Sequence, residues 1–318
     1  MDKLLVGVDI GGTTVKLSII DIHGVMKTKW EIPTNTSEGG TFIVSDIAHS
    51  VEDKLIALQI EKDSVQGIGI GAPGFIDVGK GIIFEAVNIG WKNFHLKDEM
   101  EKAINIPTFV DNDANLAAVG EMWQGAGHGA KNLLCVTLGT GVGGGIIAGG
   151  EIIHGESGMA GEIGHITSVT ENGAPCNCGK KGCLETVASA TGIARLATEL
   201  LSEYSSSTLQ EIYNQNGTLT SKDVFDAAQE KDALAVNVVN QSAKYLGFAL
   251  GNLANALNPE TIVIGGGVSK AGDSLINSIK EYFNKYAIPK IAKETVIRTA
   301  TLGNDAGVYG AAWLAKHK

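Results

Sequence analysis

The chain has little positive charge and few aromatic side chains, and each shortage excludes a class of partner. Lys and Arg number 25 against 35 Asp and Glu among 318 residues, which gives a formal net charge of −10. Nucleic acids and anionic membranes attract basic surfaces, so the acidic balance argues against both as partners. Aromatic residues make up 6% of the sequence and the 4 Trp are scattered, so no stacking platform for nucleic-acid bases is expected.

Long apolar runs and cysteines are also scarce. The first apolar stretch, at residues 4–8, meets Asp9 well short of a signal-peptide core. No run approaches the roughly 18 uncharged apolar residues that a membrane span requires. Only 4 Cys are present, too few for a disulfide framework in a chain of this size. We therefore expect a cytoplasmic protein without a membrane span.

Glycine, in contrast, is abundant. The chain has 42 Gly but only 6 Pro and no Gly-X-Y period, which excludes collagen and a Pro/Gly linker. Hydrophobic residues make up 44%, enough for a buried core, so disorder is excluded as the main state. The glycines cluster after apolar runs, where a backbone turns tightly or lies close to a ligand.

Apolar strands alternate with amphipathic helices along the chain, a pattern that predicts an α/β architecture. Strands are expected at residues 3–9, 15–20, 25–32, 65–71, 108–110, 132–138, 143–147 and 261–264. Helices are expected at residues 41–60, 96–104, 113–124, 232–257, 271–286 and 305–317.

One unit, a strand followed by a small polar residue, a Gly-rich turn and a second strand, occurs twice. Asp9-Ile10-Gly11 in the first copy corresponds to Thr137-Leu138-Gly139 in the second. The repetition predicts two similar domains. We expect a smaller N-terminal lobe at residues 1–120 and a larger C-terminal lobe at 121–304, with the helix at about 305–318 returning to the first lobe.

The Gly-rich turns are candidate phosphate sites. Asp9 to Thr14 joins two strands, so it is neither a Rossmann motif nor a P-loop, which join a strand to a helix. Its bare N–H groups can form a nest for an anion, and Asp9 could hold Mg²⁺ through water. An ordinary hairpin turn is an equally good explanation of this motif alone. A second copy of the turn lies at 139–145, and Gly265-Gly266-Gly267 lies at another strand end. These features favour two hairpins that bind a polyphosphate, with the glycine triplet near a nucleoside.

Asp111-Asn112-Asp113 lies where a strand enters a helix. Helix capping is the common role of such residues and explains at least one of the three. The remainder suggest a substrate site, in which one aspartate is the general base for a hydroxyl and the asparagine hydrogen-bonds the same substrate. The surrounding motifs favour this second interpretation.

One His and three Cys lie within residues 165–183, in a loop with little apolar content. Their types and spacing fit a tetrahedral zinc site, which would replace a hydrophobic core in this loop. The alternative is three reduced surface thiols beside an unrelated histidine. Glu162 and Glu185 flank the loop, so a metal would fix two carboxylates relative to one another. The ligands are His165, Cys176, Cys178 and Cys183.

The remaining reactive side chains suggest ordinary roles. Cys135 lies in an apolar strand and is expected in the core, and Lys180 and Lys181 are expected in a solvated loop. Six histidines have no Cys or carboxylate at ligand spacing and are expected on the surface or in turns: His23, His49, His95, His128, His154 and His317.

Together these motifs resemble the ROK family of sugar kinases, and within it the bacterial glucokinases. The match spans nearly the whole chain and is most specific in the Glu–His and Cys-x-Cys-x4-Cys combination. The stretches that carry it are Asp9–Thr13, Asp111–Asn115, Leu138–Gly145, Gly161–His165, Cys176–Gly179, Gly182–Thr186 and Gly303–Gly307.

The resemblance implies a duplicated actin-like (ribonuclease H-like) fold of two lobes with a cleft between them. It implies ATP-dependent phosphorylation of a hexose, chiefly glucose, at the 6-hydroxyl, with Mg²⁺ and a structural Zn²⁺. Repressors of this family begin with a helix-turn-helix, whereas the first expected strand here starts at residue 3, which favours an enzyme.

The resemblance also implies roles for individual residues. Asp113 would be the general base, and His165 would have one ring nitrogen on zinc and the other toward the sugar. The other sugar contacts would be Asn112, Glu162 and Glu185, with Gly71 and Asn88 second in rank. The residues facing the phosphates and Mg²⁺ would be Asp9, Gly11, Gly12, Thr13, Lys16, Thr140 and Gly141, with Gly266 nearer the nucleoside.

Several alternatives stay open at this point. The hexose could be mannose, fructose or N-acetylmannosamine, and the phosphoryl donor could be polyphosphate. A non-catalytic sugar sensor on the same scaffold, or an actin-like ATPase, would carry similar hairpins, although a phosphate-only machine has no use for the zinc loop. Family members are commonly homodimers or homotetramers, so the resemblance implies such an assembly.

Overall fold

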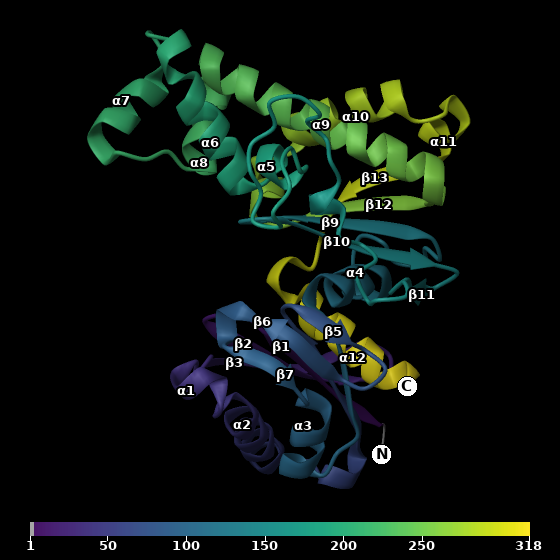
Figure 1. Cartoon of the computed structure of the whole chain (residues 1–318). Coiled ribbons are helices and arrows are strands. Elements are labelled where there is room, and N and C mark those ends of the chain that lie inside the picture. Colours follow the sequence, from purple (N-terminus) through teal and green to yellow (C-terminus); the bar gives the residue numbers. More distant parts are fainter. Residues whose placement is uncertain (1–2) are drawn as a thin grey trace. The chain divides into compact units, whose positions relative to one another are not determined.

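The computed structural model describes residues 3–318 and divides them into two compact units (Figure 1). The first contains the chain up to Lys131 together with Gly145–Gly161 and Thr301–Lys318. The second contains Asn132–Gly144 and Glu162–Ala300. Residues 3–318 form two five-stranded sheets and one three-stranded sheet.

The sheet of the first unit has the order β3-β2-β1-β4-β8. β1 is antiparallel to β2 and parallel to β4, which is parallel to β8. Parallel strands end at the same edge of a sheet, and here the register aligns Asp9 with Gly71 and Gly71 with Asp111. The strands are β1 (Leu4–Ile10), β2 (Thr14–Asp21), β3 (Met26–Pro33), β4 (Val65–Ala72) and β8 (Thr108–Asn112).

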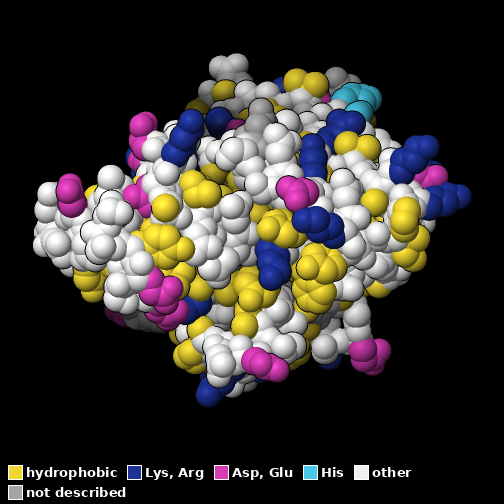
Figure 2. Space-filling model, turned by 90° about the horizontal axis from the view of Figure 1, so that it is seen from above, with side chains coloured by type: hydrophobic (Ala, Val, Ile, Leu, Met, Phe, Trp, Pro, Cys, Tyr) yellow, Lys and Arg dark blue, Asp and Glu magenta, His cyan; other side chains and the backbone are white. Residues whose placement is uncertain are grey.

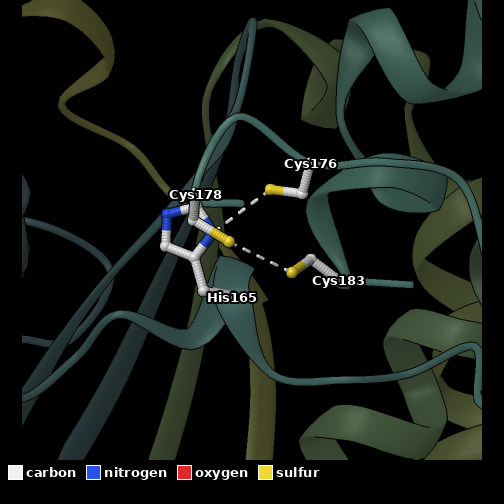
Figure 3. A group of neighbouring side chains, drawn as sticks. All are labelled: His165, Cys176, Cys178 and Cys183. Atoms are coloured by element: carbon white, nitrogen blue, oxygen red, sulfur yellow. Dashed lines mark hydrogen bonds between the residues drawn. The ribbon is translucent and has the colours of Figure 1, made fainter. Parts of the chain in front are cut away.

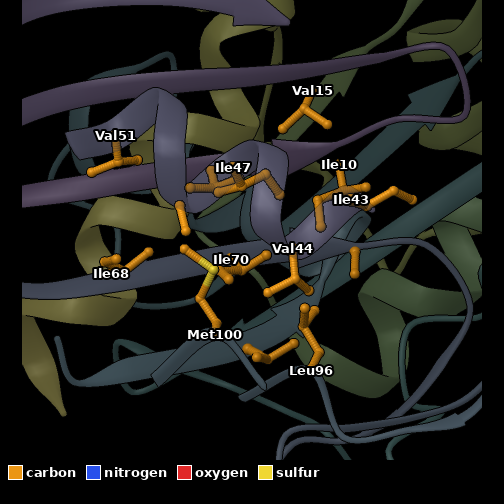
Figure 4. Packing of buried hydrophobic residues seen from close by; sticks show 14 of the residues in the cluster. Ile10, Val15, Ile43, Val44, Ile47, Val51, Ile68, Ile70, Leu96 and Met100 are labelled. Atoms are coloured by element: carbon orange, nitrogen blue, oxygen red, sulfur yellow. The ribbon is translucent and has the colours of Figure 1, made fainter. Parts of the chain in front are cut away.

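One face of this sheet is covered by α2 (Ile43–Ala57) and α3 (Leu96–Ile104). Alternate strand residues such as Ile10 and Ile70 pack there against helix residues such as Ile47 (Figure 4), because strand side chains point to opposite faces in turn. A three-stranded antiparallel sheet lies between β4 and α3 in sequence, with α1 (Ser37–Gly40) earlier in the chain. Its strands are β5 (Phe75–Asp77), β6 (Ile82–Ala86) and β7 (Trp91–Phe94).

The opposite face is covered by α4 (Asp113–Gln124) and α12 (Ala306–His317), which lie side by side in Figure 1 although they are far apart in sequence. Leu5 packs there with Ala312. Glycines permit very close approach: a Cβ on Gly69 of β4 would lie 1.8 Å from the carbonyl oxygen of Ala311 in α12. The C-terminal helix therefore belongs to the core of the first unit.

The second sheet repeats the strand order of the first, β11-β10-β9-β12-β13. β9 is parallel to β12, which is parallel to β13, and β10 is antiparallel to β11. The second sheet thus shows the duplication predicted from the two Gly-rich hairpins. The strands are β9 (Leu133–Leu138), β10 (Val142–Ala148), β11 (Glu151–Ile152), β12 (Thr261–Gly265) and β13 (Val296–Thr299).

Helix α9 (Ala233–Leu257) is the longest helix of residues 3–318, and most other helices of the second unit pack against it. A side-chain oxygen of Asp232 accepts a hydrogen bond from the Ala235 N–H at its start, and the helix ends at Asn258 before a proline. The helices are α5 (Glu185–Ala188), α6 (Ala190–Leu200), α7 (Thr208–Asn216), α8 (Ser221–Gln229), α9 (Ala233–Leu257), α10 (Asp273–Tyr286) and α11 (Pro289–Glu294).

The contact boundaries differ from the division drawn at residue 120. Residues 121–131 and 145–161 group with the first unit, since α4 runs on to Gln124 and Gly145 packs against it. A Cβ on Gly145 would lie only 2.5 Å from the Cβ of Ala118. The sequence boundary was placed inside α4, because no proline or polar linker marks the true crossing points.

Charged and hydrophobic side chains are mixed on the face drawn in Figure 2, where Lys, Arg, Asp and Glu are scattered among hydrophobic side chains. Within residues 3–318, no helix has the length and apolar character needed to cross a bilayer.

Substituting Gly69 by Ala tests the close packing of α12. The added methyl would collide with the Ala311 carbonyl, so we expect a loss of about 1–3 kcal/mol, the usual cost of overpacking. Thermal denaturation should show a fall in Tm of several degrees. Gly267→Ala is the matched control, because a Cβ there meets nothing within 4 Å. Equal Tm values for the two variants would contradict this account.

Candidate active site and metal centre

Three residues of the first unit meet where β1, β4 and β8 end. A Cβ built on the buried Gly71 would lie 3.7 Å from Asp9 Oδ1 and 3.7 Å from the Cα of Asp113. Gly71 therefore separates the two aspartates by the smallest possible residue. Asp9, the predicted Mg²⁺ residue, and Asp113, the predicted general base, therefore lie on either side of Gly71.

Asn112 is the residue that caps α4. Its side-chain oxygen accepts hydrogen bonds from the N–H groups of Ala114 (2.9 Å) and Asn115 (3.3 Å). Its amide nitrogen donates to the Gly74 carbonyl at 3.3 Å. Asp113 is the first helical residue and is exposed, with Oδ1 2.8 Å from the Ala114 nitrogen. The capping role that the sequence assigned to at least one of these three residues thus belongs to Asn112.

Asp111 points the other way and is completely buried. Oδ1 accepts from the Asn112 N–H at 2.7 Å and from Asn115 Nδ2 at 3.1 Å, and Oδ2 lies 2.7 Å from His154 Nε2. The expectation that His154 has no carboxylate partner was wrong. No spacing rule could reveal this contact, because the two residues are far apart in sequence and meet only through the fold.

The first Gly-rich turn is fastened at its base and open at its tip. The Gly11 N–H donates to the Thr14 carbonyl at 3.0 Å, and Thr34 Oγ1 donates to the Gly11 carbonyl at 2.7 Å. Gly12 and Thr13 at the tip are exposed. The exposed Asn88 lies beside it, since a Cβ on Gly12 would be 3.8 Å from the Asn88 Cβ. A predicted phosphate residue and a predicted sugar contact are therefore neighbours.

Asp9 lies against the first turn of α12, where a Cβ on Gly307 would be 2.7 Å from its carboxylate. Lys16 Nζ is 3.9 Å from Asp9 Oδ2. Burial raises the pKa of the Asp9 carboxyl above its ordinary value, and Lys16 offsets only part of that effect. A carboxylate held at this cost is suited to bind a cation, and Gly307 leaves the space that the Asp9 carboxylate needs.

The second Gly-rich turn carries a carboxylate of its own. Glu185 Oε2 accepts a hydrogen bond from the Val142 N–H at 3.1 Å, and a Cβ on Gly141 would lie 2.2 Å from the same oxygen. Gly141 therefore makes room for Glu185. The exposed Thr140 has its carbonyl bonded by Thr191 Oγ1 at 2.8 Å. Gly266 adopts φ +85° close to the end of β9, a conformation that favours glycine.

The predicted metal ligands converge (Figure 3). The ligand atoms of His165, Cys176, Cys178 and Cys183 all lie within 4.8 Å of one another. Cys178 Sγ is 3.6 Å from Cys183 Sγ, and Cys176 Sγ is 3.5 Å from His165 Nδ1. Zn–S bonds of about 2.3 Å in a tetrahedron require sulfur separations of about 3.8 Å, so the four atoms have the spacing of a zinc site.

Hydrogen bonds of the loop backbone help to hold the cysteine sulfur atoms in place. The Cys176 N–H donates to the Lys180 carbonyl at 2.9 Å, and Lys180 Nζ donates to the His165 carbonyl at 2.6 Å, so Lys180 is not merely solvated as expected. The Lys180 N–H donates to Cys178 and is the main cause of the lowered pKa of that thiol. Burial raises the pKa of the Cys183 thiol to about 12.

The two flanking glutamates lie close to this cluster. Glu162 Oε2 lies 3.8 Å from His165 Nε2, the ring nitrogen turned away from the sulfur atoms. Cys176 Sγ lies 3.7 Å from Glu185 Oε1, which is the oxygen that Val142 does not use. The cluster therefore has one carboxylate on each side, as its position in the sequence predicted.

The chain matches known proteins along its whole length. The model of the ROK family matches residues 5–318. The chain belongs to the ROK family. It is 59% identical over 317 residues to a glucokinase of Halalkalibacterium halodurans, a match that covers 100% of this chain and 96% of the relative.

Solved structures agree with the family assignment. The ROK hexokinase of Thermus thermophilus is 32% identical, with a TM-score of 0.84 and coverage of 98% of this chain and 97% of that one. A ROK family glucokinase of Streptomyces griseus, solved in complex with glucose and AMPPNP, is 33% identical, with a TM-score of 0.79 and coverage of 99% and 100%. The predicted duplicated, actin-like α/β fold is confirmed.

Replacing Asp9 by Asn separates stability from function. The substitution removes a half-buried charge, so we expect a Tm about 2 °C or more above wild type at pH 7 in EDTA. The raised pKa implies that this gain vanishes as the pH falls below 3.8, where Asp9 is protonated in folded and unfolded chains alike. ATP-dependent turnover should fall at least about tenfold. A lower Tm at pH 7, measured by scanning fluorimetry, would refute the assigned cost of this charge.

Proposed function

We propose that this chain transfers the γ-phosphoryl group of ATP to the 6-hydroxyl of glucose. The observation that carries the proposal is the position of Asp113, which is exposed at the edge where β1, β4 and β8 end while its neighbour Asn112 performs the capping. An exposed carboxylate at this position can accept a proton from a substrate hydroxyl. The 59% identity to a glucokinase over the whole chain supports glucose as the acceptor.

Asp113 acts as the general base. A carboxylate of ordinary basicity need not deprotonate the hydroxyl in the ground state, because the transition state for phosphoryl transfer is loose. It accepts the proton late, when the sugar oxygen is already bonding to phosphorus. Most of the catalysis then consists of positioning the hydroxyl and stabilising charge on the phosphates.

The Gly-rich turns receive the nucleotide. The proposed phosphate contacts are the exposed Gly12 and Thr13, with Lys16, beside the first Gly-rich turn, and Thr140 and Gly141 in the second. Asp9 would hold Mg²⁺ through water, and the ion would neutralise phosphate charge. Gly266 lies near the nucleoside. The AMPPNP complex of the Streptomyces griseus relative supports ATP as the donor.

Sugar binding uses the amide and carboxylate groups already located. The Asn112 amide nitrogen gives one N–H to Gly74 and retains a second for a sugar hydroxyl. Glu162, Glu185 and His165 Nε2 hold other hydroxyls, while Gly71 and Asn88 make lesser contributions. A homodimeric or homotetrameric assembly stays a prediction.

The His165 cluster binds structural zinc in this proposal. Zinc would draw His165 Nδ1 and three thiolates together and so orient the Nε2 edge toward the sugar. The spacing of the four ligand atoms supports this assignment. With the metal bound, the loop keeps Glu162 and Glu185 in place without a hydrophobic core of its own.

Changing Asp113 to Asn tests the base. We expect glucose affinity, measured by calorimetry, to stay within a few-fold, while kcat falls by at least about 10²–10³, the scale of general-base loss. A coupled ADP-release assay with glucose, mannose, fructose and N-acetylmannosamine measures turnover with ATP, and an assay of the hexose phosphate formed tests polyphosphate as a second donor. The control Asp98→Asn alters an exposed aspartate in the first turn of α3. Near-normal kcat in Asp113→Asn would eliminate the assignment, and sugar binding without turnover in wild type would indicate a sensor.

Changing Cys178 to Ser tests the metal. We expect zinc content, measured by mass spectrometry on protein purified without chelators, to fall well below one ion per chain. The KM for glucose should rise at least about tenfold, because Glu162, His165 and Glu185 lose their common anchor. Cys135→Ala is the control, since Cys135 is buried in β9 apart from the cluster. Full activity in a zinc-free variant would show that the metal has no role in ordering the sugar site.

A further inference from the structure

The Asp111–His154 pair is a structural feature of the first unit that the proposed chemistry does not use. Asp111 is 0% exposed, yet it lies directly beside Asn112 and Asp113 in sequence. A fully buried carboxylate is costly unless hydrogen bonds and a compensating charge surround it. Its retention next to the candidate base therefore requires an explanation beyond packing.

The hydrogen bonds of Asp111 span the junction between β8 and α4. Oδ1 accepts from the backbone N–H of Asn112 at 2.7 Å and from the side chain of Asn115, in the first turn of α4, at 3.1 Å. These two bonds restrain the Asp111–Asn112 peptide and the first turn of α4, which lie on either side of Asp113. Asp111 therefore restrains the backbone from which the Asp113 carboxylate projects.

His154 in turn fixes Asp111. Its Nε2 lies 2.7 Å from Oδ2, and because a carboxylate only accepts hydrogen bonds, Nε2 is the protonated nitrogen. His154 follows β11, and its carbonyl accepts from the Ala160 N–H at 2.9 Å. The imidazole therefore belongs to a separate segment, 154–160, in which this backbone hydrogen bond restrains His154.

The other side of the imidazole is accessible. His154 lines a cavity of about 710 Å³ in the first unit, whose wall also includes Lys97, Phe109, Glu156 and Ser157. Removal of the ring would therefore extend an existing opening rather than create a sealed void. A small molecule can reach Asp111 through this cavity when the ring is absent.

We propose that His154 is a positioning residue for phosphoryl transfer. It does not touch the substrate but holds Asp111, which holds the Asn112 peptide and the first turn of α4, so that Asp113 meets the sugar hydroxyl in one orientation. The inference rests on the proposed function, because it assigns His154 a part in that reaction. Misplacing a reacting group by about 1 Å can cost about 10²-fold in rate, so a positioning effect is measurable.

The test compares His154→Ala with His154→Gln in the full chain. The alanine variant should lose about 10–100-fold in kcat, with glucose affinity and the KM for ATP within about twofold of wild type. The glutamine variant keeps an N–H near the position of Nε2 and should recover most of the loss. Added imidazole should restore part of the kcat of His154→Ala by entering through the cavity. Ser157→Ala, on the same cavity wall, is the matched control.

A second measurement is independent of turnover. Hydrogen–deuterium exchange of a peptide covering residues 108–116 should be at least about tenfold faster in His154→Ala than in wild type and near wild type in His154→Gln, because the Asn112 N–H loses a fixed acceptor only in the former. If wild type releases no ADP with any hexose, the proposed function fails while this exchange still decides the coupling.

Two results would overturn the inference. The first is unchanged exchange at 108–116 together with wild-type kcat in His154→Ala. The second is an equal loss of kcat in the alanine and glutamine variants, with no response to imidazole and a matching fall in Tm, which is the behaviour of a purely structural residue.

Discussion

The parallel pairing of β4 with both β1 and β8 is the constraint on which the first unit depends. Because the three strands run in the same direction, their carboxyl ends reach one edge, and the register places Asp9, Gly71 and Asp111 in a row. On the sheet face opposite α2 and α3, α12 packs closely because Gly69 leaves room for it. This packing restrains β4 and the sheet edge at which it ends. Acidic groups can then be brought together without any loop having to define their positions.

The three residues that follow Val110 show how one edge serves three purposes. Asp111 points into the protein and is buried, Asn112 caps α4, and Asp113 is exposed. Strand alternation sends neighbouring side chains in different directions, and the helix start then requires a cap at one position only. A single strand–helix junction therefore supplies an anchor, a cap and an exposed carboxylate within consecutive residues.

The sequence could predict what depends on local pattern. The duplicated hairpins, α9 with its long apolar stripe and the ligand set at 165–183 were all predictable, since spacing alone carries them. The strands β5 to β7 are too short for periodicity to reveal. The contact of His154 with Asp111 and the space that Gly141 leaves for Glu185 could not be predicted, because they join segments that meet only in the fold.

Glu185 makes the two predicted sites of the second unit interdependent. One of its oxygens accepts from the Val142 N–H next to the Gly-rich turn, and the other lies 3.7 Å from Cys176 of the metal cluster. If the sulfur atoms move apart, Glu185 loses its contact with Cys176, which is one of its two restraints. The turn then loses a carboxylate for which Gly141 leaves space. A metal bound by the cluster would therefore influence the Gly-rich turn, because Glu185 contacts both the cluster and the residue that follows Gly141.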